Sequence, residues 1–184
     1  VDNGCNIWNK DAYNYYLKKC RENKIIPVNN NDFIKFTKRG NVKDHFDKYK
    51  FGDLGKVYGH YWRNYDGFDQ IKDIIDKMIN TPMSSEIIVT ARNPNDKDNQ
   101  ALPCCHYGFQ IVMRPLSDLE RVLMIDPNYE KKKSTLSFGQ ARLLFENLKI
   151  SNVPKYGFEL HWDQRSVDTF LGLPYNITSY ATLV

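Results

Sequence analysis

The sequence contains few of the residues that would build a disulfide framework or a metal site. Four cysteines occur in 184 residues, which is too few for a disulfide-rich scaffold. Two of them, Cys104 and Cys105, are neighbours and would be awkward disulfide partners for each other. The Cys-Cys-His run at 104–106 also lacks the roughly two to four residues that usually separate a pair of metal ligands. The sequence therefore predicts no metal site. It leaves two interpretations of the paired thiols: a reactive group in a reducing compartment, or buried and inert core residues.

Long apolar runs, targeting signals, glycine-rich phosphate loops and internal repeats are missing as well. No stretch approaches the roughly 20 apolar residues that cross a bilayer, and no secretory signal precedes the first predicted helix. The formal net charge is +4, but most lysines are scattered or alternate with aspartates. The densest cluster, EKKKS at 130–134, is too short to indicate nucleic-acid binding. We therefore expect a cytoplasmic protein that binds neither a membrane nor nucleic acid.

What the sequence does contain is the composition and periodicity of a globular α+β domain, with 41% hydrophobic and 14% aromatic residues. Apolar residues at helical spacing predict helices, and β-branched runs bounded by turn residues predict strands. The alternation of the two favours a mixed β-sheet packed by helices in one domain over residues 1–184. The predicted helices cover 11–23, 68–80 and 138–149, and the predicted strands cover 86–92, 106–113 and 156–164.

The remaining segments are predicted to be irregular or interrupted. Residues 23–51 and 115–155 read as insertions, the first of them a loop, and residues 93–103 read as a loop. After residue 165 the pattern predicts a helical turn, a break at GLP, and an apolar helix that continues to the last residue.

Three motifs stand in a familiar order: GDLGKVYGHYWRNY at 52–65, ALPCCH at 101–106 and DQRSVDTFLGLPYNITSYATL at 163–183. With IWN at 7–9 upstream, they resemble the thymidylate synthase family over most of the chain outside the two insertions. The resemblance implies a thymidylate synthase-like α+β fold. The family's catalytic glutamate lies upstream of the IWN segment and a ribose contact lies downstream of the last motif. Neither has a counterpart here, so we expect an incomplete chain.

The resemblance also implies the nucleophile. Cys105, directly before His106, would be the catalytic cysteine, and Cys104 would fill the core. A thiolate that adds to carbon 6 of uracil makes carbon 5 nucleophilic toward a one-carbon electrophile. Arg165 would favour the thiolate and hold the nucleotide phosphate, as its planar fork allows.

Further substrate contacts follow from the same motif. Gln164 and Ser166 would bind the substrate beside Arg165. The Asn176 amide would match the 3-NH and 4-oxygen of uracil and stabilise charge on that oxygen, so Asn at this position predicts dUMP over a cytosine nucleotide.

Other family positions imply a reduced folate as co-substrate, 5,10-methylenetetrahydrofolate. Tyr58 and His106 would order water and polar groups for removal of the proton from carbon 5. Asp168 would contact the pterin ring. The remaining folate-facing candidates are Trp8, for which a core role is an equal alternative, Leu171 and Gly172.

The chain departs from the family pattern before the strand at 86–92. The family has two arginines that reach the partner's phosphate across a dimer interface, and this chain has Ser85 and Glu86. Arg92, where the family usually has tryptophan, is a candidate replacement cation. The predicted activity is thymidylate synthesis by a homodimer joined through its sheet faces. The alternatives are a pyrimidine nucleotide hydroxymethylase of the same family and a nucleotide-binding relative without turnover.

Overall fold

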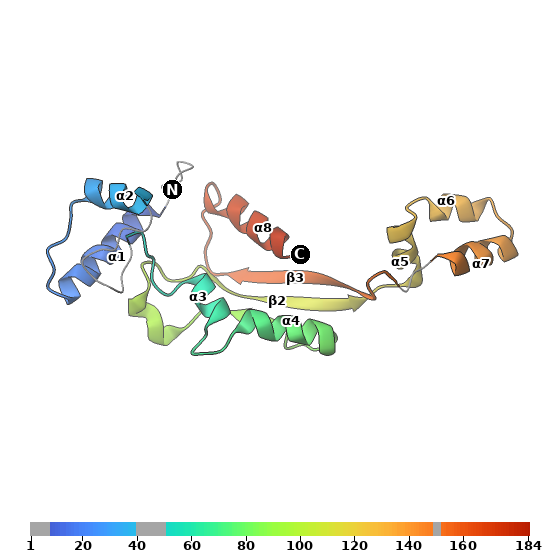
Figure 1. Cartoon of the computed structure of the whole chain (residues 1–184), viewed down its shortest axis with the longest axis horizontal. Helices are drawn as coiled ribbons and strands as arrows, with labels where there is room; N and C mark the ends of the chain where they lie inside the picture. The colour runs from blue at the N-terminus through green and yellow to red at the C-terminus, as the bar shows by residue number, and fades with distance from the viewer. Residues whose placement is uncertain (1–7, 40–50, 149–151) are drawn as a thin grey trace. The chain divides into compact units, whose positions relative to one another are not determined.

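The computed structural model describes residues 8–39, 51–148 and 152–184, and the chain divides into two compact units. Unit 1 comprises Val1–Ile71, Thr90–Gly108 and Gln164–Val167, and unit 2 comprises Lys72–Val89, Phe109–Asp163 and Asp168–Val184. Figure 1 shows the elements in chain order by colour. Helices and a three-stranded sheet are both present, which confirms the predicted α+β class.

Unit 1 is built on aromatic side chains that pack between helices α1 (Asn9–Glu22) and α2 (Asn30–Arg39). In α1, Ala12, Tyr15 and Tyr16 are buried at helical spacing. The ring of Tyr16 lies 5.1 Å from that of Phe33 in α2. A second cluster of Tyr61, Ala91 and Cys104 joins α3 (Tyr58–Arg63) to residue 91 and to the segment that carries the paired cysteines. The 3₁₀ helix η1 (Pro94–Asn99) lies in the chain between residue 91 and that segment.

Unit 2 contains most of the sheet, whose strand order is β1-β2-β3. The strands are β1 (Ile88–Thr90), β2 (His106–Pro115) and β3 (Tyr156–Gln164). The Ile111 N–H donates to the Ile87 carbonyl at 2.9 Å and the Leu116 N–H donates to the Lys155 carbonyl at 2.9 Å. This register makes both described strand pairs antiparallel, so the described strands contain no parallel pair of the expected mixed sheet.

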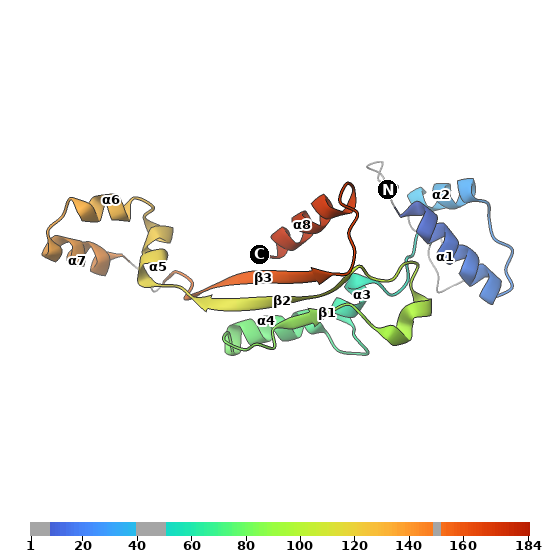
Figure 2. The ribbon, with the colours of Figure 1, turned by 180° about the vertical axis from the view of Figure 1, so that it is seen from behind.

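Helix α8 (Gly172–Leu183) packs on the sheet of unit 2. The Tyr180 ring of α8 stacks on Trp162 of β3 at 5.0 Å and lies 5.8 Å from Phe109 of β2. Figures 1 and 2 both show α8 alongside β3. Helix α4 (Gln70–Asn80) matches the helix predicted at 68–80.

Several segments predicted to be irregular are helical. The region 23–51 contains α2, the loop at 93–103 contains η1, and the segment 115–155 contains two helices that were not predicted, α5 (Asp118–Ile125) and α6 (Tyr129–Ser134). Helix α7 (Phe138–Asn147) matches the helix predicted at 138–149. Ser117 and Ser137 begin α5 and α7 with capping boxes, a sequence signal that marks a helix start. The break predicted at GLP is wrong. Helix α8 begins at Gly172 and includes Pro174, because a first-turn proline loses no helical hydrogen bond.

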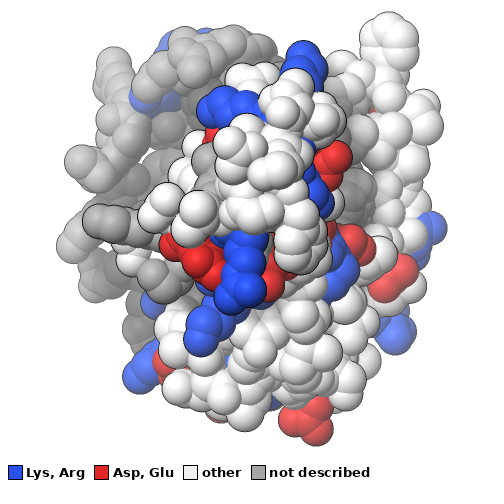
Figure 3. All heavy atoms as spheres, turned by 90° about the vertical axis from the view of Figure 1, so that its right-hand side faces the viewer, with Lys and Arg blue, Asp and Glu red and all other residues white. Residues whose placement is uncertain are grey.

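The described surface carries charges of both signs. On the face drawn in Figure 3, Lys and Arg side chains are interleaved with Asp and Glu side chains. Across the described ranges, no helix is both long and apolar enough to cross a bilayer.

Candidate functional site

Pairing of strands β2 and β3 brings together two segments that lie far apart in the sequence. Cys105 immediately precedes β2, and Arg165 immediately follows β3. The Arg165 backbone N–H donates to the Cys105 carbonyl at 2.9 Å. Both residues belong to unit 1, so the cysteine and the arginine of two separate motifs meet at one end of the β2–β3 pair.

The Cys105 sulfur has two polar side chains beside it. Arg165 Nη2 lies 3.8 Å from Sγ, and the Ser166 hydroxyl donates toward Sγ at 3.5 Å. Cys105 is half-buried and forms no disulfide. A guanidinium and a hydroxyl at these positions stabilise negative charge on sulfur, which is the charge that a nucleophilic thiolate carries.

The Arg165 guanidinium is held by backbone carbonyls on the cysteine segment. Its Nε donates to the Cys104 carbonyl at 3.2 Å, and its Nη2 donates to the Pro103 carbonyl at 3.0 Å. These bonds fix the planar group beside Cys105, so its position depends on the conformation of residues 103–105.

Cys104 lies in the core of unit 1, with 9% of its surface exposed. Burial raises the pKa of its thiol to about 11, so the group is protonated at neutral pH. The adjacent cysteines therefore differ: Cys104 belongs to a buried cluster with Tyr61 and Ala91, and the sulfur of Cys105 lies beside a guanidinium and a hydroxyl.

Tyr58 connects α3 to the cysteine segment. The Cys105 backbone N–H donates to the Tyr58 hydroxyl at 2.8 Å, and the Tyr58 ring lies 4.8 Å from the His106 ring. Burial raises the pKa of the Tyr58 phenol, so the hydroxyl keeps its proton and can donate it to a further acceptor. The structure thus brings together five of the predicted site residues: Cys105, His106, Tyr58, Arg165 and Ser166.

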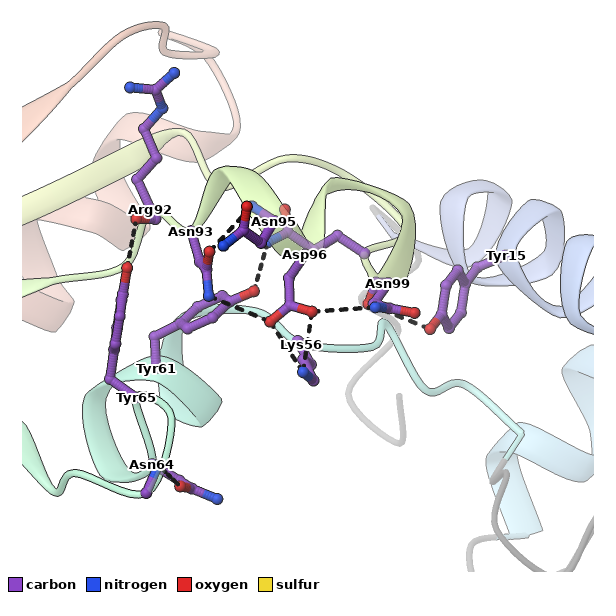
Figure 4. Close-up of polar contacts among 12 residues, drawn as sticks. Tyr15, Lys56, Tyr61, Asn64, Tyr65, Arg92, Asn93, Asn95, Asp96 and Asn99 are labelled. Atoms are coloured by element: carbon purple, nitrogen blue, oxygen red, sulfur yellow. Dashed lines mark hydrogen bonds and ion pairs between the residues drawn. The ribbon is translucent and has the colours of Figure 1, made fainter.

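A polar network that the sequence did not reveal centres on Asp96 of η1 (Figure 4). Lys56 Nζ donates to both carboxylate oxygens of Asp96, at 3.0 and 2.9 Å. Asn99 donates to the same carboxylate at 3.1 Å, and the Gln100 amide donates to the Tyr61 hydroxyl at 3.0 Å. Asp96 is 7% exposed, and its charge is neutralised by Lys56.

A cavity of about 520 Å³ opens beside this network within unit 1. It has three cationic residues in its wall, and one of them is Arg165. None of the residues that line it is acidic. The lining residues are Ala91, Arg92, Asn93, Pro94, Lys97, Gln100, Pro103, Cys104, Tyr107 and Arg165.

The predicted folate-facing residues Asp168, Leu171 and Gly172 belong to unit 2, as does Asn176 on α8. The Asp168 carboxylate accepts N–H groups of Phe170 and Leu171 through Oδ1, at 2.9 and 2.8 Å. These bonds, that of Leu171 above all, lower the pKa of Asp168. A backbone hydrogen bond from Gly172 to the carboxylate lowers this pKa further.

The other predicted positions are placed as follows. Gln164 ends β3 in unit 1, and Trp8 stands at the start of α1 with 45% of its surface exposed. Ser85 and Glu86 lie in unit 2, where Glu86 accepts Lys77 through its backbone carbonyl at 3.2 Å. No group of three or more His, Cys, Asp or Glu residues that would suit a metal ion occurs within the described ranges.

The chain is similar in sequence and in structure to proteins described as thymidylate synthases. A family model described as thymidylate synthase matches residues 1–184. The chain is 33% identical to the thymidylate synthase of Mycoplasma genitalium and 34% identical to that of Mycoplasma mobile, in each case over its whole length and 48% of the relative. It resembles the crystal structure of thymidylate synthase from T4 phage with a TM-score of 0.55 and 28% identity, over 98% of this chain and 39% of that one. The chain spans about half the length of the curated relatives it matches. The chain belongs to the thymidylate synthase family.

Proposed function

We propose that this chain carries the nucleotide-alkylating centre of a thymidylate synthase. In that reaction a one-carbon unit passes from 5,10-methylenetetrahydrofolate to carbon 5 of dUMP, giving dTMP and dihydrofolate. The observation that carries the proposal is the setting of the Cys105 sulfur. It lies 3.8 Å from Arg165 Nη2 and 3.5 Å from the Ser166 hydroxyl, while the neighbouring Cys104 thiol is buried and protonated.

The chemistry begins with the thiolate of Cys105. Its sulfur forms a bond to carbon 6 of the uracil ring, and the π electrons of the carbon 5–carbon 6 bond move onto carbon 5 and the 4-oxygen as an enolate. Arg165 and Ser166 stabilise the sulfur anion before the addition and again when the sulfur departs from carbon 6 at the end. Asn176 would donate its amide N–H to the 4-oxygen as charge develops there.

Proton transfer at carbon 5 falls to the Tyr58–His106 pair. Once carbon 5 carries the new substituent, its hydrogen must leave as a proton before the exocyclic double bond can form. Tyr58 is protonated and contacts His106 through its ring, so the two side chains supply a hydroxyl and an imidazole for water-mediated transfer.

The Asp168 carboxylate is a hydrogen-bond acceptor, which suits the N–H groups of a reduced folate. Bound 5,10-methylenetetrahydrofolate supplies the one-carbon unit and the hydride that completes the methyl group. The ionised Asp168 carboxylate would accept N–H groups of the pterin, while its Oδ1 keeps the backbone of residues 170–171 in place.

The test is the intact mass of the chain after incubation with 5-fluoro-dUMP, with and without methylenetetrahydrofolate. Fluorine at carbon 5 does not leave as a proton does, so a competent site stalls as a covalent complex. We expect a folate-dependent adduct on the wild type and on Cys104→Ala, and none on Cys105→Ala. An adduct that persists in Cys105→Ala, or a wild-type chain that forms none, contradicts the proposal. With dUMP itself, product mass separates a methyl group from the hydroxymethyl group of the related hydroxymethylases.

A further inference from the structure

Three cationic side chains line the cavity of about 520 Å³ in unit 1: Arg92, Lys97 and Arg165. Arg92 follows strand β1, Lys97 lies on η1, and Arg165 follows strand β3. No Asp or Glu is among the residues of the cavity wall. Like charges that converge on one concave surface repel each other, and an anion in the cavity relieves that repulsion.

Two of these cations have no partner of their own among the described residues. The hydrogen bonds of Arg92 there involve its backbone, whose N–H donates to the Thr90 hydroxyl and whose carbonyl accepts the Tyr65 hydroxyl. Figure 4 shows its guanidinium directed away from the Lys56–Asp96 ion pair. The Lys97 ammonium likewise forms no ion pair within the described ranges, whereas nearby Lys56 is paired with Asp96 at 2.9 Å.

Arg165 also keeps donors for a ligand. Its Nε and Nη2 are held by the carbonyls of residues 103 and 104 and by the Cys105 sulfur. Its Nη1 has no hydrogen bond in the part of the chain that the structure describes. Arg165 therefore borders the cavity and the proposed nucleophile at once, and an anion bound at its free edge lies one side chain away from Cys105.

We propose that this cavity binds the phosphate monoester of the nucleotide substrate, and that Arg92 and Lys97 are anion-binding residues of this chain beside Arg165. A phosphate monoester carries about two negative charges at pH 7 and matches three cations better than a carboxylate does. The Arg92 fork can bind two phosphate oxygens together. The volume suits a whole small ligand, since such pockets measure roughly 300–1,000 Å³. The inference rests on the proposed function in taking a nucleoside monophosphate as the ligand. It also accounts for Ser85 and Glu86 at positions where the family's phosphate-binding arginines would stand.

The test compares the binding of dUMP, deoxyuridine and inorganic phosphate by titration calorimetry. Arg92→Gln and Lys97→Gln each remove one cation from the cavity. Arg21→Gln and Lys10→Gln remove one exposed cation of unit 1 from outside it. We expect Arg92→Gln to weaken dUMP binding about tenfold and Lys97→Gln to weaken it about threefold, with deoxyuridine binding unchanged. Equal losses in Arg92→Gln and Arg21→Gln would overturn the proposal.

A chemical probe separates this inference from the catalytic proposal. Phenylglyoxal modifies accessible guanidinium groups, and peptide masses locate the modified arginines. Saturating dUMP or inorganic phosphate should protect Arg92 and leave Arg21 reactive, whereas deoxyuridine should protect neither. Protection of Arg92 without a 5-fluoro-dUMP adduct supports the phosphate site and contradicts the catalytic proposal. A 5-fluoro-dUMP adduct that forms while Arg92 stays fully reactive supports the catalytic proposal and contradicts the phosphate site. Failure of every ligand to protect Arg92 also contradicts the phosphate site.

Discussion

Cys104 and Cys105 are adjacent in the chain, but their sulfur atoms lie in different surroundings. Burial raises the pKa of the Cys104 thiol to about 11, so at pH 8 only about one thiol in a thousand is ionised. Cys105 is half-buried beside a guanidinium and a hydroxyl. We expect iodoacetamide at pH 8 to alkylate Cys105 in the folded chain and to leave Cys104 unmodified, as read from peptide masses. In urea both should react, and comparable labelling of the two in the folded chain would contradict this assignment.

The Tyr58 hydroxyl fixes the backbone next to the nucleophile. Replacement by Phe removes the acceptor of the Cys105 N–H, which now lies 2.8 Å away. The loss of this buried hydrogen bond should cost about 1 kcal/mol of unfolding free energy. Because residues 103–105 also hold Arg165, we expect adduct formation with 5-fluoro-dUMP to slow by about tenfold. Tyr175→Phe is the matched control, since Tyr175 is 64% exposed. Equal adduct rates for the two variants would show that the Tyr58 hydroxyl does not position the Cys105 segment for the reaction.

At the scale of elements, η1 is tied to the segment before α3 by the Lys56–Asp96 ion pair. The Lys56 hydrogen bonds are the main cause of a lowered pKa at Asp96. A carboxyl whose folded-state pKa is depressed stabilises the fold above its unfolded pKa of about 4 and loses that contribution as the pH falls through the folded value. We expect Asp96→Asn to lower the unfolding free energy at pH 7 by roughly 1–2 kcal/mol, as measured in urea.

The pH dependence distinguishes this effect from a general packing defect. The stability difference between wild type and Asp96→Asn should shrink as the pH is lowered from 5 toward 3 (about one unit either side of the carboxyl's ordinary pKa). Asp98→Asn is the control, because the Asp98 side chain is 93% exposed and its Lys18 contact is 3.6 Å long. A difference that stays constant with pH would mean that the Asp96 charge is not what stabilises η1.

How much of each element could be predicted depends on where its stabilising contacts lie in the sequence. The prediction of a strand at 156–164 matches the observed bounds, because aromatic and leucine side chains alternate there with glycine and polar residues. Helix α2 is missed because its few apolar residues stand among Asn, Asp and Lys, and because its fully buried Phe33 packs on distant aromatic rings of α1 and on Phe51. The start of α8 differs from the prediction, because a proline at GLP predicts a break and Pro174 instead lies in the first turn of the helix.

The candidate site shows the same limit. Motif order predicted Cys105, Arg165 and Ser166 together, although the contacts between them span 60 and 61 residues, which no periodicity reveals. Lys97 was not predicted, because its contribution depends on a 3₁₀ helix that turns it into a cavity wall. The Lys56–Asp96 pair was missed for a related reason: its partners are 40 residues apart, and neither belongs to a regular pattern.

At the scale of the whole molecule, apolar side chains remain exposed on the sheet of unit 2. The Ile111–Ile87 hydrogen bond sets residue 88 opposite residue 110, so Ile88 and Val112 are diagonal neighbours on one face. Ile88 is 51% exposed and Val112 is 44% exposed. β-branched residues side by side on an open sheet face suit contact with a second copy of the chain, because a two-fold axis lets such a patch pack against itself.

We therefore predict a homodimer in solution whose interface includes this face. Val112→Asp would place two carboxylates near each other across the two-fold axis, and burying unpaired like charges weakens association by at least about tenfold. Sedimentation velocity should give a dimer for the wild type and a monomer for Val112→Asp at the same concentration, with unchanged far-ultraviolet circular dichroism. Ile79→Asp is the control, since Ile79 is 71% exposed at the end of α4 and lies off the sheet. A wild type that sediments as a monomer would contradict the predicted dimer. An Ile79→Asp variant that dissociates as much as Val112→Asp would exclude this face as the interface, because the loss of association would then not depend on the position of Val112.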